Sequence, residues 1–600
     1  MQKRQESKMY RTEHPNPQFE RKSYECLNGV WEFEKGEYND GVQNRRLASE
    51  IEVPFCPESK LSGIGDTELF TDCIYARDIE VEAEDLKGRL FLHFGAADRV
   101  ATVYVNGKKA GTHEGGYTAF SVEITPYVKT GKNRIAVSIH DDVRENYPSG
   151  KQVKEALPHG CFYTRVTGIW QTVWLERTPE EYVKSVKFYP DTENCRVKTE
   201  LITEGKGHTE ISVYYEGRRV GYAEGDGYYR QNFEIVLSEK HLWEPGHGRL
   251  YDVKIKFGND EVGSYFGLRD VRYAGKKFLL NGKSVFQRLV LDQGYYGAGH
   301  YTAPDTETMK KDIRLGLTLG FNGARLHQKV FEQRFLYECD RAGYMVWGEY
   351  PSWGVRCEDI DALGAFIGEW SETVEQYFNH PCIITWCPLN ETWENLEDKG
   401  KVRDIRFPEI LYRVTKLLDC TRPCVDVSGG YHGRYTDLFD FHCYHTPEEI
   451  SRYIEALEEK NELVMDTLYG ADPEKGTLYN GEAPTNASEY GGVAYVADGG
   501  WGYRTKSTEE DFVNDYVAMT KQFLNCGKIS GFCYTQLYDV EQEQNGLFAY
   551  DRKPKLSEEA MRKIADCNSQ TAKIEMSEEQ KEESVLSGEE RKKVLSVCAG

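Results

Sequence analysis

The sequence predicts a multidomain β plus α/β fold: a jelly-roll β-sandwich, an immunoglobulin-like β-sandwich and a (β/α)8 TIM barrel, in that order. Three observations support this prediction. The chain of 600 residues is too long for one hydrophobic core. Up to about residue 272, short alternating runs follow one another between Gly, Asn and Pro turns. After residue 273, apolar strands alternate with helical repeats.

Residues 10–180 are expected to form the jelly roll. Runs such as RLFLHFGAADRVATVYVNGKKAGTH alternate without helices, and Asn106-Gly107 is a strong hairpin signal between two strands. The same pattern continues over residues 181–272 in KSVKFYP, RVKTELIT, EISVYYEG, QNFEIVL and YDVKIKF. Five or more strands in about ninety residues are typical of an immunoglobulin-like sandwich.

Residues 273–570 are expected to form the barrel. Asp305 can cap a helix with Met309, Ile313 and Leu317 on one face, and Gly320 marks its end. An apolar stripe from Leu363 to Tyr377 predicts a second helix. Eight short apolar strands complete the pattern: SVFQRLVLDQG, FNGARLHQ, YMVWGEYPSW, IITWCPLNE, CVDVSGGY, LFDFHCYH, NASEYGG and SGFCYTQLYD. The charge-dense tail, 571–600, is expected to be a solvated helix or disordered.

Composition excludes several classes of partner. The 75 basic and 98 acidic residues give a net charge of −23, which argues against nucleic acid and anionic membranes. The N-terminus is polar, and no run reaches the roughly 18 apolar residues of a membrane span. The 16 cysteines show no metal-ligand spacing and are interpreted as free thiols of a cytoplasmic protein. We expect no metal and no organic cofactor; homo-oligomerisation is left open.

Two glutamates at strand ends suggest chemistry on a sugar. Hydrolysis of a glycosidic bond with retention needs two carboxyl groups about 5 Å apart, one protonated and one ionised. The fourth predicted strand ends in Asn390-Glu391, and the seventh contains Ser488-Glu489. Strands four and seven lie on roughly opposite sides of an eight-stranded ring, so the two carboxyl groups should face each other.

Several motifs resemble glycoside hydrolase family 2. The segment NHPCIITWCPLNE, residues 379–391, is similar to the family's acid/base signature, N-H-P-S-I-hydrophobic-x-W-x-x-x-N-E. FNGARLHQ, with Asn322 and Arg325, resembles its second signature. GIWQTVWLE (168–176) and DRKPK (551–555) resemble the end of the jelly roll and the segment that closes the barrel. The resemblance spans about residues 10 to 560 and implies the same domain order.

The resemblance also implies roles for five residues. Glu391 would be the general acid/base and Glu489 the nucleophile of an exo-acting retaining β-glycosidase. Asn390 would bind the sugar 2-hydroxyl, a contact that strengthens in the transition state. Tyr444 would donate a hydrogen bond to the nucleophile, and Arg325 would add positive potential beside it, so that both keep Glu489 ionised.

Further candidates stand at strand ends. Asp292, His442 and His445 are candidates for contacts with sugar hydroxyls, although a structural role fits each histidine equally well. Glu349 is interpreted as a residue that orients its neighbours. Three tryptophans follow strands and are candidates for stacking on the sugar, with loop packing as the alternative: Trp353, Trp393 and Trp501.

Departures from the family pattern bear on the sugar. The strand-2 motif usually continues Arg-x-Ser-His-Tyr, whereas this chain reads Arg-Leu-His-Gln-Lys over residues 325–329, which displaces His327. Strand eight presents Tyr-Thr-Gln (534–536) in place of Trp-Asn-Phe. Residues 543–545, Glu-Gln-Asn, lack the Asn-x-Lys pair with which β-glucuronidases hold the sugar carboxylate. Lys329 is the nearest cation that could replace that pair.

The preferred interpretation is therefore a β-galactosidase acting on neutral sugars. β-Glucuronidase, β-galacturonidase and β-mannosidase are the alternatives within the class. A catalytically inactive carbohydrate-binding protein is the alternative from another class, but it would require the loss of a catalytic carboxylate, and both are present.

Overall fold

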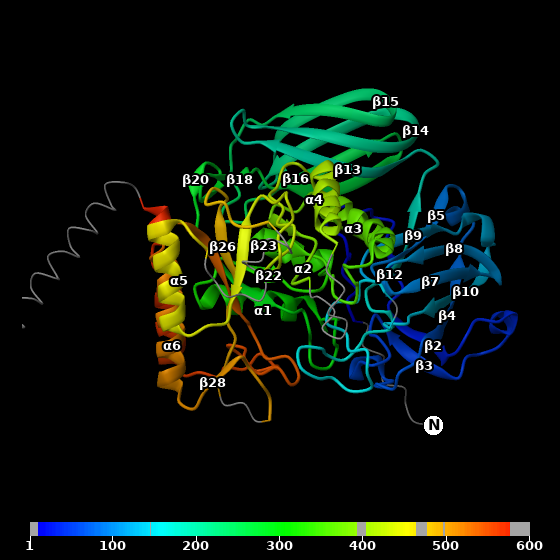
Figure 1. Cartoon of the computed structure of the whole chain (residues 1–600). Coiled ribbons are helices and arrows are strands. Elements are labelled where there is room, and N and C mark those ends of the chain that lie inside the picture. Colours follow the sequence, from blue (N-terminus) through cyan, green and yellow to red (C-terminus); the bar gives the residue numbers. More distant parts are fainter. Residues whose placement is uncertain (1–9, 145, 393–403, 464–476, 496–498, 577–600) are drawn as a thin grey trace, which may run out of the picture.

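The computed structural model describes residues 10–144, 146–392, 404–463, 477–495 and 499–576. It contains a jelly roll, an immunoglobulin-like domain and a barrel, the order that the sequence predicts. Figure 1 shows the two β domains beside the barrel, with the long strands of the second domain projecting beyond it. Their hydrophobic cores are separate, and the largest belongs to the barrel.

The jelly roll consists of two antiparallel sheets with a shared core. Asn106 and Gly107 have φ values of 51° and 79°, as a tight type I′ turn requires, which confirms the predicted hairpin. The smaller sheet contains β1 (Glu25–Cys26), β12 (Val173–Thr178), β5 (Arg89–Phe94) and β9 (Phe120–Glu123). The larger contains β3 (Ser49–Val53), β2 (Gly29–Lys35), β4 (Asp72–Val81), β10 (Gly131–His140), β7 (Val100–Val105) and β8 (Lys108–Glu114). The short strands β6 (Ala97–Asp98) and β11 (Gly168–Ile169) pair beside them.

The immunoglobulin-like domain is built around one very long strand. The first half of β14 pairs with β13 and its second half with β16, so the sheet folds over a common core. Its strands are β13 (Tyr182–Asp191), β14 (Arg196–Tyr215), β15 (Arg218–Val236), β16 (Tyr251–Phe257) and β17 (Asp260–Phe266). A small antiparallel sheet leads into the barrel: β18 (Val271–Ala274), β19 (Lys277–Leu280) and β20 (Lys283–Ser284).

The barrel strands run parallel in the order β24-β23-β22-β21-β29-β26-β25. Seven of the eight predicted strands are regular: β21 (Gln287–Asp292), β22 (Gly323–Leu326), β23 (Met345–Glu349), β24 (Ile383–Cys387), β25 (Phe439–Cys443), β26 (Thr485–Gly491) and β29 (Ile529–Thr535). The fifth, CVDVSGGY, joins β24 only through isolated parallel bridges, Trp386 to Cys424 and Asn390 to Ser428. Gly429, at φ 64°, turns the chain there and prevents a regular strand.

Helices cover the barrel. The Asp305 side chain accepts a hydrogen bond from the Thr308 amide and caps α1, and Gly320 follows its end with φ 79°, which confirms the predicted signals. Leu317 was expected on the buried face but is 36% exposed, because it lies one position off the stripe of Met309, Ile313 and Gly316. The helices are α1 (Thr306–Thr318), α2 (Gln333–Ala342), α3 (Leu363–Tyr377), α4 (Arg406–Leu418), α5 (Pro447–Lys460), α6 (Glu509–Leu524) and α7 (Glu558–Asn568), with two short strands, β27 (Val493–Tyr495) and β28 (Arg504–Lys506), before α6.

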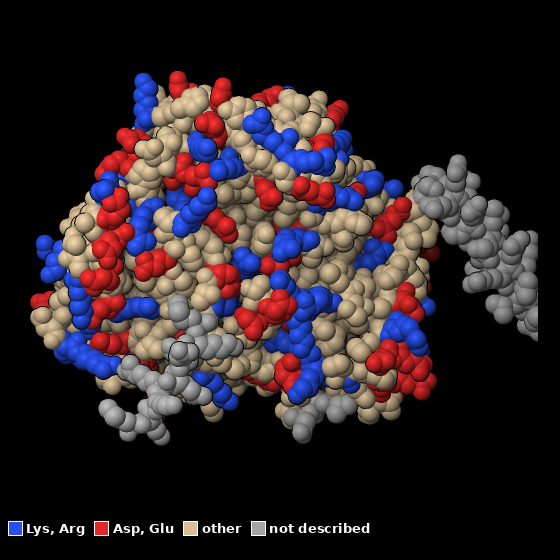
Figure 2. Space-filling view, turned by 180° about the vertical axis from the view of Figure 1, so that it is seen from behind, with Lys and Arg blue, Asp and Glu red and all other residues tan. Residues whose placement is uncertain are grey.

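The predicted charged tail begins later than residue 571. Ile574 is buried, and Glu575 forms an ion pair of 2.7 Å with Arg288 of the barrel. Residues 577–600 lie outside the described residues. Acidic and basic side chains are interspersed on the face seen in Figure 2. Across the described ranges all cysteines are free thiols, and no helix is long and apolar enough to span a bilayer.

Candidate active site

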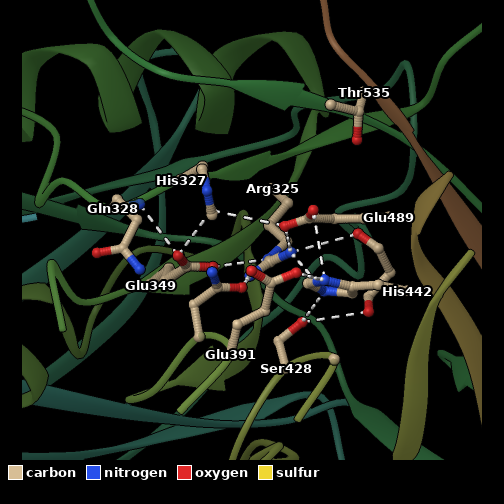
Figure 3. Close-up of polar contacts among 12 residues, drawn as sticks. Arg325, His327, Gln328, Glu349, Glu391, Ser428, His442, Glu489 and Thr535 are labelled. Carbon is tan, nitrogen blue, oxygen red and sulfur yellow. Dashed lines mark hydrogen bonds and ion pairs between the residues drawn. The ribbon is translucent and has the colours of Figure 1, made fainter. Parts of the chain in front are cut away.

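The carboxyl-terminal ends of the barrel strands bring the two predicted carboxylates together. Glu489 lies within β26, and Glu391 follows β24. Both are buried, and one oxygen of each lies within 4.8 Å of the other and of a ring nitrogen of His442 (Figure 3). This spacing matches the close pair of carboxyl groups, about 5 Å apart, that a retaining glycosidase uses, and is shorter than the separation in inverting enzymes.

Glu489 is surrounded by donors and positive charge. Its Oε1 accepts a hydrogen bond of 2.7 Å from Nη1 of Arg325, and its Oε2 accepts one from the hydroxyl of Tyr444. Burial favours the neutral carboxyl group, but the charges of His442, Arg325 and Lys151 outweigh it and lower the pKa of Glu489 to about 2. Glu489 is therefore ionised at neutral pH.

Arg325, on β22, organises this side of the site. It is fully buried and donates from Nε to Glu349 (2.6 Å) and from Nη2 to Oδ1 of Asn390 (2.6 Å). Glu349 also accepts a bond of 3.0 Å from the Gln328 amide, so it holds its neighbours in place, as the sequence predicts. Nδ2 of Asn390 is buried and has no hydrogen-bond partner in the described part of the chain, which leaves it free to donate to a ligand oxygen.

His442, on β25, lies between the two carboxylates. Its Nδ1 is 2.5 Å from Oε1 of Glu391 and 3.4 Å from Oε2 of Glu489. Burial disfavours a charged imidazole, but these two carboxylates raise the pKa of His442 above its ordinary value. The sequence predicted a sugar contact or a structural role here and missed this bridging position. His445 lies elsewhere, 3.7 Å from Glu449 on α5.

A buried hydrogen-bond chain behind His442 was also missed. Asp440, His442 and Tyr444 alternate along β25 and its end, so their side chains point to the same face. The Ser428 hydroxyl donates to Oδ2 of Asp440 (2.7 Å) and lies 3.2 Å from Nε2 of His442. The Asp-x-His-x-Tyr alternation was a signal for this chain, whereas Ser428 sits in the irregular fifth strand and had none.

Among the described residues, Lys329 and Asp292 lie in a buried cluster that does not contact the two carboxylates. The residue before Lys329, Gln328, has a positive φ of 52°. The ammonium group of Lys329 donates to the carbonyl oxygens of Gly294 (2.7 Å) and Tyr301 (2.8 Å). Four rings surround it: Trp170, Tyr296, Tyr301 and Phe331.

Asp292 belongs to the same buried region. Its Oδ1 accepts hydrogen bonds from the Gly294 amide (2.9 Å) and the Tyr538 hydroxyl (2.5 Å). Burial and the neighbouring Asp312 raise the pKa of Asp292 to about 6. These contacts hold the loop after β21.

The predicted tryptophans connect loops around the site. Nε1 of Trp353 donates to the carbonyl oxygen of Asn390 (3.1 Å), directly before Glu391. Nε1 of Trp501 donates to the carbonyl oxygen of Gly160 in the jelly roll (2.7 Å). Both bonds are loop contacts. Trp393 lies outside the described residues.

The jelly roll contributes a cation that the sequence did not reveal. The Ser149 amide donates to the carbonyl oxygen of Trp353 (2.8 Å), which fixes the loop after β10 to the barrel. Lys151, 6% exposed, lies 5.4 Å from the Trp353 ring and 5.7 Å from the Tyr163 ring. Its charge acts on Glu489, yet no described carboxylate lies within ion-pair distance of its ammonium group. No local motif marks Lys151, because only the domain contact brings it here.

A second buried cluster could hold a metal by residue type alone: Asp340, His380 and Cys382. Its ligand atoms are already used. Nδ1 of His380 is 2.6 Å from Asp340 and Nε2 is 2.9 Å from Gln333, while the Cys382 amide donates to Asp340 (2.8 Å). These bonds fasten the segment before β24 to α2, which is a structural role.

Comparisons with known proteins identify the family of the jelly roll and the barrel. Residues 66–179 match the model of the sugar binding domain of glycosyl hydrolases family 2, and residues 271–569 match that family's TIM barrel domain. A β-galactosidase of Thermoanaerobacter pseudethanolicus is 27% identical over 58% of this chain, and the alignment spans only 47% of that protein. A β-glucuronidase of Sus scrofa is 26% identical over 70% of this chain and 71% of its own.

Solved structures support the fold. A β-glucuronidase of an uncultured Clostridium sp. superimposes with a TM-score of 0.74 at 21% identity, covering 92% of this chain and 98% of its own. A β-glucuronidase of Bifidobacterium dentium gives 0.76 at 20% identity with the same coverage. At this identity the likeness establishes the three-domain architecture and not the substrate.

Proposed function

Because this chain belongs to glycoside hydrolase family 2, we propose that it is a retaining exo-β-glycosidase with Glu489 as nucleophile and Glu391 as acid/base. The observation that supports this most is the asymmetry of the close carboxylate pair. Only Glu489 is held by a guanidinium group and a phenol hydroxyl, which keep it ionised for attack. Glu391 has the imidazole of His442 as its neighbour and is left to exchange a proton.

In the first step, Glu489 attacks the anomeric carbon while the glycosidic C–O bond breaks. The bonding electron pair leaves with the glycosidic oxygen, which takes a proton from Glu391. Asn390 donates its free Nδ2–H to the sugar 2-hydroxyl as positive charge develops on the ring. In the second step, Glu391 accepts a proton from water, and the water oxygen displaces Glu489 from the sugar with overall retention.

Neutral β-galactosides are the proposed substrates. A sugar carboxylate would need a cationic or multi-donor partner at C5. Lys329 is occupied by two carbonyl oxygens, so it is no such partner. Glu543 stands in the stretch that corresponds to the Asn-x-Lys pair of β-glucuronidases, and its carboxylate accepts bonds from Tyr163 (2.5 Å) and Asn545 (3.1 Å). The carboxylate of Glu543 would repel the carboxylate of a uronic acid bound at this position.

A β-uronidase is the second candidate, and Lys151 is the observation that favours it. A largely buried ammonium group that forms no ion pair with any described carboxylate is a suitable partner for a sugar carboxylate. The names of the relatives are divided in the same way, between β-galactosidase and β-glucuronidase.

A panel of 4-nitrophenyl β-glycosides tests the proposal. We expect the galactoside to have the highest kcat/KM, and the β-anomer to be the first sugar product seen by proton NMR. Appearance of the α-anomer first would contradict retention. No turnover of any glycoside by the folded protein would favour a carbohydrate-binding protein instead.

A further inference from the structure

Both ring nitrogens of His442 lie close to polar groups. Nδ1 lies 2.5 Å from Oε1 of Glu391, and an ionised carboxylate oxygen at this position would accept the hydrogen bond. Nε2 lies 3.2 Å from the hydroxyl oxygen of Ser428. The Ser428 hydroxyl can donate to Oδ2 of Asp440, 2.7 Å away, and its oxygen can then accept from Nε2. Nη1 of Arg325 lies farther from Nε2, at 3.4 Å. Two carboxylate oxygens face Nδ1, and a hydroxyl oxygen that can accept lies beside Nε2, so these neighbours favour the protonated, positively charged imidazole.

The chain behind Ser428 keeps a negative charge close to this imidazolium. Oδ2 of Asp440 also accepts from the Ser488 hydroxyl, and Oδ1 lies 3.2 Å from Nε2 of His432. Nδ1 of His432 is 2.7 Å from Asp426. Burial opposes ionisation of Asp440, but the bond and charge of His432 prevail and lower the pKa of Asp440 below its ordinary value.

We propose that His442 stores the catalytic proton and passes it from Nδ1 to Oε1 of Glu391 when a substrate enters. This inference rests on the proposed function, because His442 would supply the proton that Glu391 gives to the leaving oxygen. The N–H bond of His442 breaks and an O–H bond of Glu391 forms, so both lose their charge. In the second half of the reaction, Glu391 takes a proton from water and returns it to His442, which closes the cycle.

The charges around His442 favour this exchange. When no sugar is bound, the carboxylates of Glu391, after β24, and Glu489, on β26, face the His442 ring. Arg325, on β22, and Asp440, on the same strand as His442, are other charged groups around the ring. The imidazolium offsets the repulsion between two carboxylates within 4.8 Å of each other. A bound sugar displaces water and lowers the local dielectric constant, which makes the separated charges of His442 and Glu391 less stable than the neutral pair.

Leaving-group dependence of His442→Gln tests the proposal. Without the stored proton, kcat/KM should fall about 100-fold for a phenyl glycoside, as for loss of general acid catalysis. For the matched 2,4-dinitrophenyl glycoside, which needs little protonation, it should fall less than about fivefold. Equal losses on both substrates would reduce His442 to a structural residue and overturn the proposal.

Ser428→Ala provides a second readout. Removal of the acceptor at Nε2 destabilises the imidazolium, so its proton is lost at a lower pH. The basic limb of the kcat/KM profile should therefore move to lower pH, while activity below that limb is kept. An unmoved basic limb would contradict the proposal.

His445→Gln is the matched control, because His445 lies two residues past β25 and contacts Glu449 and Tyr453 of α5. It should leave both readouts unchanged. The aryl glycosides should carry the sugar that the panel selects, so a wrong sugar does not affect the test. If the wild-type protein cleaves no glycoside, the proposed function fails. If it cleaves glycosides but His442→Gln loses the same kcat/KM on the phenyl and the 2,4-dinitrophenyl glycoside, only this inference fails.

Discussion

Arg325 and Glu489 form a buried ion pair in which Nη1 and Oε1 are 2.7 Å apart. The same guanidinium group binds Glu349 and Asn390, so one residue connects the nucleophile to the amide beside the acid/base. Together with the charge of His442, this pair keeps the almost fully buried carboxyl group of Glu489 ionised. The first prediction tests this relationship.

Replacement of Arg325 by Met should raise the pKa of Glu489, which is about 2 in the native protein. A carboxyl group with a depressed pKa contributes stability above its unfolded pKa, and that contribution is lost as pH falls toward the folded pKa. The variant should therefore lose activity at a higher pH on the acidic limb of kcat/KM. The free energy of unfolding should fall by about 3–5 kcal/mol, because two buried carboxylates lose their partner.

Arg325→Lys keeps a positive charge, so it should shift the acidic limb of the kcat/KM profile less than Arg325→Met does. This variant also keeps the prediction testable if the Met variant does not fold. Denaturant unfolding and the pH dependence of kcat/KM measure the two effects. An acidic limb that coincides with wild type in a folded variant would show that Arg325 does not control the ionisation of Glu489.

Tyr444→Phe removes the hydroxyl that donates to Oε2 of Glu489. A hydrogen bond to a charged group contributes about 1.5–3 kcal/mol, so kcat should fall roughly 10- to 100-fold. Tyr490→Phe is the control, because the Tyr490 hydroxyl bonds Thr520 on α6 (2.7 Å) on the outer side of the strand. Steady-state kinetics at the pH optimum should separate the two variants, and equal effects would exclude a direct role for Tyr444.

The roles of the two carboxylates can be separated by substitution. Glu489→Ala should abolish turnover. Glu391→Ala should remain partly active on aryl glycosides with good leaving groups, and azide should restore its rate by intercepting the glycosyl-enzyme. The glycosyl azide from the Glu391 variant should keep the β configuration, because azide attacks the glycosyl-enzyme. If the Glu391 variant gave a glycosyl azide of inverted configuration and the Glu489 variant one of retained configuration, the two roles would have to be exchanged.

The sugar preference can be tested on two lysines that differ in environment. Wild type should cleave 4-nitrophenyl β-galactoside with a higher kcat/KM than the β-glucuronide, and Lys151→Met should keep that order. Lys329→Met is the control: it should affect both substrates alike, because Lys329 contacts backbone oxygens in an aromatic enclosure. Faster glucuronide cleavage that is lost in Lys151→Met, but not in Lys329→Met, would identify a β-uronidase.

Much of the fold could be predicted because local signals were consistent with it. The Asn106-Gly107 turn, the Asp305 cap and the stripe of α3 each correspond to an observed element. The sequence could not predict that the fifth barrel strand is irregular, because this geometry depends on isolated bridges to β24 and on the turn at Gly429. Glu391 and Glu489 could be found since motifs and strand order both mark them.

The rest of the site depends on contacts between distant segments. Strand position made Lys329 a candidate for a sugar contact, but it could not predict that its ammonium group binds two backbone carbonyl oxygens. Lys151 reaches the site only through docking of the jelly roll onto the loop after β23. The bridging position of His442 follows from side-chain geometry across three strands, which a pattern along one strand does not contain.

Covalent labelling tests the central claim most directly. An activated 2-deoxy-2-fluoro-β-glycoside of the preferred sugar should inactivate the protein, because the fluorine slows hydrolysis of the glycosyl-enzyme more than its formation. Mass spectrometry of the digested protein should then locate one added fluoro-sugar on Glu489. A label on Glu391, or time-dependent turnover without any covalent adduct, would contradict a retaining mechanism with Glu489 as nucleophile.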